Sequence, residues 1–104
     1  MPTRLEVLEM MVGKQPADPF PYYGLALEYR SAGRVDDSIT AFTRLRERFP
    51  DYVPTYLMAA QACQELGRRD GAAEWCRAGI EAARRGRDAH AAGELEAFLG
   101  TLGE

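Results

Sequence analysis

Two cysteines, Cys63 and Cys76, are the residues of this chain with the clearest capacity for chemistry. A thiol can ligate zinc, act as a nucleophile or form a disulfide. The spacing of this pair fits no zinc pattern, and no further Cys or His pair completes a set of four ligands. We therefore predict two reduced thiols that act as small apolar core groups, without a metal or a cofactor. A disulfide between them is the main alternative.

The single histidine, His90, is the other candidate for catalysis. General acid–base chemistry needs a nucleophile and an orienting partner near the imidazole. Asp88 and Glu94 lie close in sequence, but no Ser or Cys does. Asp36 and Asp37 form a carboxylate pair that helix capping explains. We predict that the protein is not an enzyme and has no catalytic residues.

Composition narrows the class of partner. The 104 residues carry a net charge of −3 with both signs interleaved, so we expect no nucleic-acid surface. We interpret the basic cluster at 84–87 as complementing a helix dipole.

No stretch approaches the roughly 20 apolar residues that span a bilayer, and the acidic N-terminal segment argues against a secretion signal. We expect a cytoplasmic protein, and the bias toward Arg over Lys suggests a GC-rich bacterial genome.

The elements that position these side chains repeat with a period of 34 residues. Gly-Arg-Val-Asp at 33–36 recurs as Gly-Arg-Arg-Asp at 67–70, and Tyr22 recurs as Tyr56. A period of this length is typical of a helical hairpin that is copied and stacked, because each copy covers the apolar face of its neighbour. The sequence predicts an all-α fold of stacked antiparallel helical hairpins.

Capping and breaking residues divide the chain into about six helices. Thr3 and Glu6 form a predicted capping box, and Asp18, Asp51 and Asp88 are predicted N-caps of later helices. Helix ends are predicted at Gly13, Gly33, Pro50, Gly67 and Gly86. Gly93, inside the last helix, either permits a close approach to a neighbouring helix or leaves its own helix marginal.

The repeat resembles the tetratricopeptide (TPR) signature. In the order of that signature, residues 19–52 carry Tyr22, Leu25, Ala26, Tyr29, Gly33, Ser38, Phe42 and Pro50. The second copy is weaker, because Cys63 and Cys76 replace the aromatic residues and Arg84 replaces the closing Pro. The resemblance implies one TPR-like domain over 1–104. Its parts are a half-repeat helix at 1–18, repeats at 19–52 and 53–86, and a capping helix at 87–104.

The repeat positions also predict the central packing. The expected core side chains are Tyr22, Leu25, Tyr29, Ile39, Phe42, Leu45, Tyr56, Ala60, Cys63 and Ile80. We interpret Trp75 as a packing residue, with a partner-binding hot spot as the alternative. Leu95, Phe98 and Leu99 of the last helix are expected to cover the final repeat, because a repeat array otherwise ends in an exposed apolar face.

The resemblance implies a non-catalytic protein-interaction module, since TPR-like domains bind peptides or protein segments in a groove lined by the first helix of each pair. The implied groove residues are Phe20, Tyr23, Leu27, Arg30, Leu57, Gln61 and Gln64. The two-carboxylate clamp known in the family needs Lys, Arg and Asn, but this chain has no Asn and its one Lys is Lys14. We expect a segment with apolar anchors and at most one carboxylate, held by Arg30.

Two alternatives to an open groove remain. In the first alternative, the C-terminal helix fills the far end of the groove with Leu95, Phe98 and Leu99. The second alternative is a structural subunit that forms a homodimer through its incomplete N-terminal end. The apolar stripe of that N-terminal helix is Leu5, Leu8, Met11 and Val12.

Overall fold

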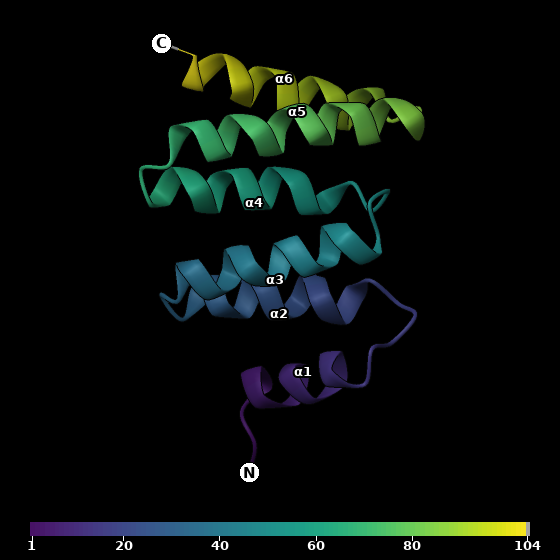
Figure 1. The fold of residues 1–104 in the computed structure, drawn as a ribbon, viewed down its shortest axis with the longest axis vertical. Coiled ribbons are helices and arrows are strands. Elements are labelled where there is room, and N and C mark those ends of the chain that lie inside the picture. Colours follow the sequence, from purple (N-terminus) through teal and green to yellow (C-terminus); the bar gives the residue numbers. More distant parts are fainter. Residues whose placement is uncertain (104) are drawn as a thin grey trace. The chain divides into compact units, whose positions relative to one another are not determined.

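The chain folds into helices that match the predicted number. The computed structural model describes residues 1–103, and these contain six helices and no strand, which confirms the all-α prediction. In chain order the helices are α1 (Arg4–Gly13), α2 (Phe20–Ser31), α3 (Val35–Arg48), α4 (Pro54–Glu65), α5 (Arg69–Arg85) and α6 (Ala89–Leu102) (Figure 1). Within residues 1–103, none of them has the length and apolar character that a bilayer crossing requires.

The helices form two compact units. The first unit is Met1–Phe49 and contains α1, α2 and α3, and the second unit begins at Pro50 and contains α4, α5 and α6. Each unit holds one hairpin, in which α2 packs on α3 and α4 packs on α5. One further helix is added to each hairpin, since α1 packs on α2 and α6 packs on α5. The division of the chain at 18, 52 and 86 stays a prediction.

Three of the six helix starts, those of α1, α2 and α6, follow the local signals in the sequence, whereas no side chain caps α3, α4 or α5. The capping box is present, because the Glu6 N–H donates to Thr3 Oγ1 and the Thr3 N–H donates to Glu6 Oε1. The Asp18 carboxylate accepts a hydrogen bond from the first N–H of α2. The Asp88 carboxylate does the same within the first turn of α6. These polar side chains satisfy N–H groups that have no partner inside their helices.

The predicted N-cap at Asp51 is wrong. Helix α4 begins at Pro54, and no side chain caps it. Proline suits the first helical position because it has no N–H to satisfy and its φ is already helical. The helix therefore starts too far along the chain for Asp51 to reach it, and Asp51 Oδ1 instead accepts from Arg85 Nε at 3.0 Å.

The buried core confirms eight of the ten expected positions. The buried members are Tyr22, Leu25, Phe42, Leu45, Tyr56, Ala60, Cys63 and Ile80. Tyr29 and Ile39 are only half-buried. Tyr29 directs its hydroxyl to Glu9 at the surface. Ile39 lies at the edge of the α3 face that Phe42 and Leu45 define, because each residue turns the helix by about 100°.

The two cysteines are buried free thiols, as predicted for Cys63 and Cys76.

The apolar stripe predicted on the N-terminal helix packs only in part. In α1, Leu8 and Val12 are buried, but Met11 is 43% exposed. Leu8 lies over Gly24 of α2, where a Cβ atom would be 3.5 Å from Leu8 Cδ2. A side chain as small as Ala at position 24 would therefore make an ordinary van der Waals contact with Leu8.

Candidate functional site

The first half of the predicted site is a stripe on α2. Phe20, Tyr23, Leu27 and Arg30 follow steps of three and four residues, which place them on one side of a helix. Phe20 is 60% exposed, and the other three are half-buried. The structure therefore brings these four residues together as one partly exposed surface that combines an aromatic, a phenolic, an aliphatic and a cationic side chain.

The opposite side of α2 fixes this stripe in place. Tyr22, Leu25 and Ala26 are buried. The Tyr22 ring meets the Phe49 ring edge-on, with centroids 5.6 Å apart. On the stripe itself, Tyr23 packs edge-on against Phe42, which is fully buried, at a centroid distance of 6.4 Å. This ring contact holds Tyr23, one member of the stripe, against the buried core.

The second half of the predicted site is a stripe on α4, in the other unit. Leu57 and Gln61 are half-buried and Gln64 is exposed, at steps of four and three residues. The inner side of α4 is anchored by Tyr56, whose hydroxyl donates to the Pro50 carbonyl. The Tyr56 ring also lies 6.0 Å from the Trp75 ring of α5. This buried contact supports the interpretation of Trp75 as a packing residue.

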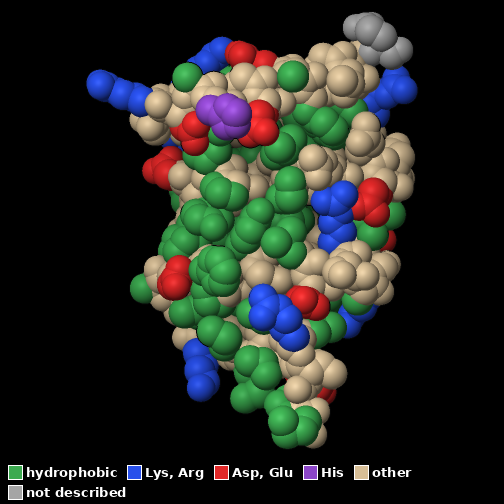
Figure 2. Space-filling model, turned by 180° about the vertical axis from the view of Figure 1, so that it is seen from behind, with side chains coloured by type: hydrophobic (Ala, Val, Ile, Leu, Met, Phe, Trp, Pro, Cys, Tyr) green, Lys and Arg blue, Asp and Glu red, His purple; other side chains and the backbone are tan. Residues whose placement is uncertain are grey.

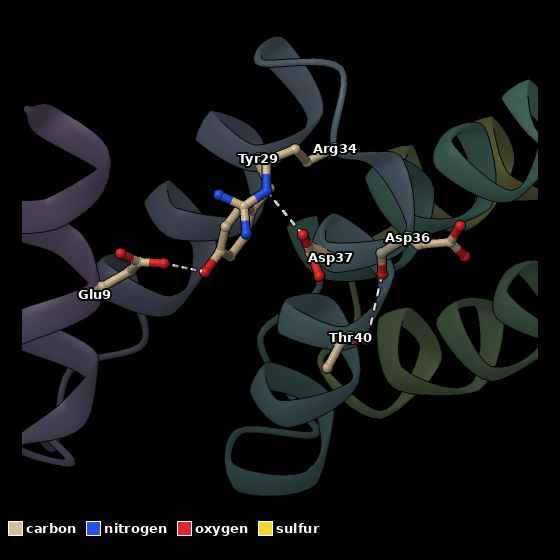
Figure 3. Close-up of polar contacts among 6 residues, drawn as sticks. All are labelled: Glu9, Tyr29, Arg34, Asp36, Asp37 and Thr40. Atoms are coloured by element: carbon tan, nitrogen blue, oxygen red, sulfur yellow. Dashed lines mark hydrogen bonds and ion pairs between the residues drawn. The ribbon is translucent and has the colours of Figure 1, made fainter.

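A polar network joins α1 to the first hairpin (Figure 3). The Tyr29 hydroxyl donates to Glu9 Oε2. The Arg34 guanidinium lies over the Tyr29 ring, 4.6 Å from its centroid, and Arg34 Nε donates to Asp37 Oδ2 at 2.8 Å. The hydrogen bond to Glu9, together with partial burial, raises the pKa of Tyr29. Sequence reasoning missed this network, because Tyr29 was assigned to the core on its repeat position alone.

The side chains with reactive potential are not assembled into a catalytic site. Burial raises the pKa of the Cys63 thiol, and it raises the pKa of Cys76 to about 11. Both thiols are therefore poor nucleophiles. The His90 side chain is 87% exposed, and its Nε2 lies 3.6 Å from Glu94 Oε1. Within residues 1–103, no group of three or more His, Cys, Asp and Glu side chains is placed to hold a metal ion.

Fold and sequence together define the class of protein, a helical-hairpin repeat. The sequence profile of the tetratricopeptide repeat family matches residues 29–95, so the chain belongs to this family. A tetratricopeptide repeat domain protein from Salinibacter ruber, known from a solution structure, is 31% identical. That likeness covers 83% of this chain and 87% of the other, with a TM-score of 0.79.

Two more distant solved structures share the fold. PcrH, solved in complex with the chaperone-binding region of PopD, is 16% identical, with a TM-score of 0.85 over 94% of this chain and 74% of PcrH. SycD, a type III secretion translocator chaperone from Yersinia enterocolitica, is 13% identical, with a TM-score of 0.82 over 94% of this chain and 68% of SycD. A search of curated protein sequences found no significant match.

Proposed function

We propose that this protein is a non-catalytic interaction module that binds a segment of a partner protein. The observation that carries the proposal is the α2 stripe, where Phe20 is 60% exposed beside Tyr23, Leu27 and Arg30. Tyr and Arg are among the side chains most enriched at binding hot spots, and Phe is enriched at protein interfaces in general. Tyr23 packs on the buried Phe42 ring, so this side chain can accept a ligand with little loss of conformational freedom.

The composition of the stripe indicates the chemistry of the partner. Apolar and aromatic side chains favour a helical or extended segment that carries two or three apolar anchors. Arg30 can hold one carboxylate of that segment. We propose Leu57, Gln61 and Gln64 of α4 as a further contact surface, within the second unit. A clamp for two carboxylates is not part of the proposal, because the chain has no Asn and its single Lys, Lys14, follows α1.

Two further observations agree with this role. The related fold of PcrH was solved with a region of PopD bound, which supports the idea that this architecture can hold a protein segment. The exposed His90 and the buried thiols agree with a non-catalytic role. Because Phe20 is the only largely exposed side chain on the α2 stripe, we expect weak and reversible binding with a Kd in the micromolar range or above.

The test begins by finding the partner with a site-specific photo-crosslinker. The crosslinker replaces Phe20 in one sample and Thr43 in a matched control sample. Thr43 is exposed on α3 and its hydroxyl bonds only within its own helix, to the Ile39 carbonyl. The proposal expects a protein that is captured from Phe20 and not from Thr43.

The second step measures the affinity of the captured partner segment for purified variants. Leu27→Ala and Tyr23→Ala should each weaken binding, by about tenfold or more if these residues are hot spots. Thr43→Ala should bind like the parent, and Gln61→Ala reports on the contribution of α4. Circular dichroism checks that each variant is folded. Unchanged affinity for both Leu27→Ala and Tyr23→Ala would show that the α2 stripe is not the site.

A further inference from the structure

A small hollow lies within the first unit of the chain. Its volume is about 290 Å³, and it is lined by Gln15, Tyr22, Arg44, Glu47 and Arg48. Tyr22 belongs to α2, Gln15 to the loop that follows α1, and the three charged residues to the last turns of α3. No residue of the α2 stripe is among the lining residues, so the hollow is a separate surface.

Tyr22 brings a hydroxyl without a hydrogen-bond partner to this hollow. The residue is 3% exposed, its ring meets Phe49 edge-on, and the Arg48 guanidinium lies 5.9 Å from the ring centroid. Within residues 1–103 the hydroxyl makes no hydrogen bond, and it is not sealed off from solvent. A buried phenol usually finds a partner, so this hydroxyl is available to a ligand in the hollow.

The second repeat shows a closed form of the same place. Tyr56 stands 34 residues after Tyr22, and its hydroxyl donates to the Pro50 carbonyl. The loop before α2 has a different backbone, because Gln15 has a φ of +51° whereas Phe49, one repeat later, has a φ of −132°. The hollow therefore stands where the second repeat has an internal hydrogen bond.

Two guanidinium groups supply positive charge at the hollow. Arg44 and Arg48 are exposed and lie one helical turn apart on α3. The corresponding residues of α5 are Ala78 and Ala82, so the hairpin of this repeat packs without side chains of this size. Glu47 also lines the hollow, which leaves a net charge of +1 on its lining side chains.

Arg44 is not committed to an acidic group of the protein. Other charged side chains are, since Arg84 Nη2 lies 2.9 Å from Glu96 Oε2 and the exposed His90, the purple side chain in Figure 2, stands beside Glu94. Within residues 1–103, Arg44 makes no hydrogen bond or ion pair. Its guanidinium can therefore bind an anion without first losing an internal partner.

We propose that the hollow binds a carboxylate, with Arg44 and Arg48 as its cationic partners and the Tyr22 hydroxyl as a further donor. A guanidinium pairs with a carboxylate through two parallel hydrogen bonds. Arg48 is already oriented, because its Nη2 donates to the Gln15 carbonyl at 2.9 Å. One negative charge balances the net charge of +1, whereas a phosphate group carries roughly −1.5 to −2 at neutral pH.

The carboxylate can come from an acidic side chain of a protein or from a small organic acid. The volume of the hollow is at the lower end of the range for ligand pockets, so only a small group enters it. The inference does not rest on the function proposed for the α2 stripe, since the two surfaces share no residue.

An NMR titration of the whole chain, labelled with ¹⁵N, tests the proposal. The probes are sodium acetate, for a free organic acid, and a peptide with blocked ends and one glutamate, for a protein side chain. Sodium chloride keeps the ionic strength constant. The Nε–H signals of Arg44 and Arg48 should shift and saturate, with a Kd in the millimolar range, because an exposed ion pair contributes little binding energy.

Matched variants assign the shifts to the hollow. Tyr22→Phe should raise the Kd for acetate by about tenfold without lowering the Tm, because its hydroxyl has no partner in the protein. Tyr56→Phe is the control, since it loses the bond to the Pro50 carbonyl and should lower the Tm but not the affinity. Arg44→Gln should raise the Kd by about tenfold or more, whereas Arg77→Gln, at an exposed position of α5, should not.

The outcomes separate the source of the carboxylate from its existence. Tighter binding of the peptide supports the proposal with an acidic side chain as the ligand, and tighter binding of acetate supports it with a free organic acid. Failure of both probes to bind at about 0.1 M overturns the proposal, and so does binding that Tyr22→Phe and Arg44→Gln leave unchanged. Phosphate that binds more tightly than acetate at equal ionic strength overturns the assignment to a carboxylate.

Discussion

Gly79 of α5 lies directly against Tyr56 of α4. A Cβ atom at position 79 would be 2.4 Å from the Tyr56 Cβ and 2.9 Å from Leu95 Cδ1 of α6. Real Cβ atoms do not approach this closely, so any side chain at this position would push α4 away from α5. The contact explains why a glycine stands in the interior of a helix, where it is intrinsically unfavourable.

Gly79→Ala should therefore destabilise the protein, by about 1–3 kcal/mol from overpacking. Gly93 provides the matched control, since outside its chain neighbours and the backbone of its own helix no atom lies within 4 Å of the place its Cβ would occupy. Gly93→Ala should stabilise α6 by about 0.5–1 kcal/mol through helix propensity. Urea unfolding of both variants gives the comparison, and a destabilised Gly93→Ala with a neutral Gly79→Ala would contradict this account.

Ser38 is a second position where the preferred residue can be inferred from the structure. Its side chain is fully buried, and within residues 1–103 its Oγ has no hydrogen-bond partner. A buried hydroxyl without a partner costs about 1–3 kcal/mol of desolvation. Ala72, the equivalent residue one repeat later, is also fully buried and has no hydroxyl.

We predict that Ser38→Ala stabilises the protein by about 1 kcal/mol. Thr40→Ala is the control, because the exposed Thr40 hydroxyl already donates to the Asp36 carbonyl (Figure 3). Thermal unfolding should show a rise in Tm of about 4–8 °C for Ser38→Ala. A lower Tm would mean that the hydroxyl is satisfied in solution.

Arg87 occupies a backbone conformation that favours glycine. Its φ is +56°, and it follows the C-cap of α5 just as Gly33 and Gly67 follow the C-caps of α2 and α4 at φ of +80° and +71°. The left-handed region costs a non-glycine residue about 1–2 kcal/mol. Arg87→Gly should therefore stabilise the protein by about 1 kcal/mol, and Gly67→Ala should destabilise it by a similar amount. Equal stability of Arg87→Gly and the parent would argue against strain at this turn.

These positions show how far the sequence alone predicts the fold. The repeat period and the glycines at 33 and 67 predicted the helices and two of their turns, because each signal is local and recurs. The turn after α5 was assigned to Gly86, but the left-handed residue is Arg87. Gly93 was a candidate for close helix approach, but the approach occurs at Gly79, because only the packing of α4 on α5 shows which glycine faces a neighbour.

The candidate site was predictable only in part. Phe20, Tyr23, Leu27 and Arg30 all fall within α2, where a period of 3.6 residues places them on one side of the helix, and their role as a binding site stays a prediction. Spacing within a helix does not predict contacts between helices. The bond from Tyr29 to Glu9 joins residues 20 positions apart in α2 and α1, and no local pattern reports it.

The buried thiol of Cys76 makes the free energy of unfolding depend on pH in the alkaline range. Burial raises its pKa to about 11, whereas a thiol in an unfolded chain has a pKa of about 8.5. As the pH rises above 8.5, the unfolded state loses this proton first and binds fewer protons than the folded state. The contribution of Cys76 to stability is therefore complete below about pH 8.5 and is lost as the pH approaches 11.

The free energy of unfolding should fall between pH 8 and pH 10 by more in the parent than in Cys76→Ala. Both chains share the other groups that titrate there, including Cys63 and Tyr29, whose pKa values are also raised. The comparison therefore isolates one thiol. Alkylation in the folded state should be slow at both cysteines. Equal pH dependence of the two proteins, or rapid labelling of Cys76, would contradict its burial.

Leu95 is the side chain through which α6 covers the last hairpin. It is 1% exposed and lies beside Gly79 of α5, while Phe98 and Leu99 are half-buried. Leu95→Ala should cost about 2–5 kcal/mol, a large share of the roughly 5–15 kcal/mol that stabilises a domain. Removal of residues 88–104 should go further and cause aggregation, since the apolar face of α5 would be exposed. Ala97→Gly, at an exposed position of the same helix, should cost only about 1 kcal/mol. Urea unfolding and light scattering measure both effects, and a truncated chain that stays soluble and equally stable would show that α6 is not a cap.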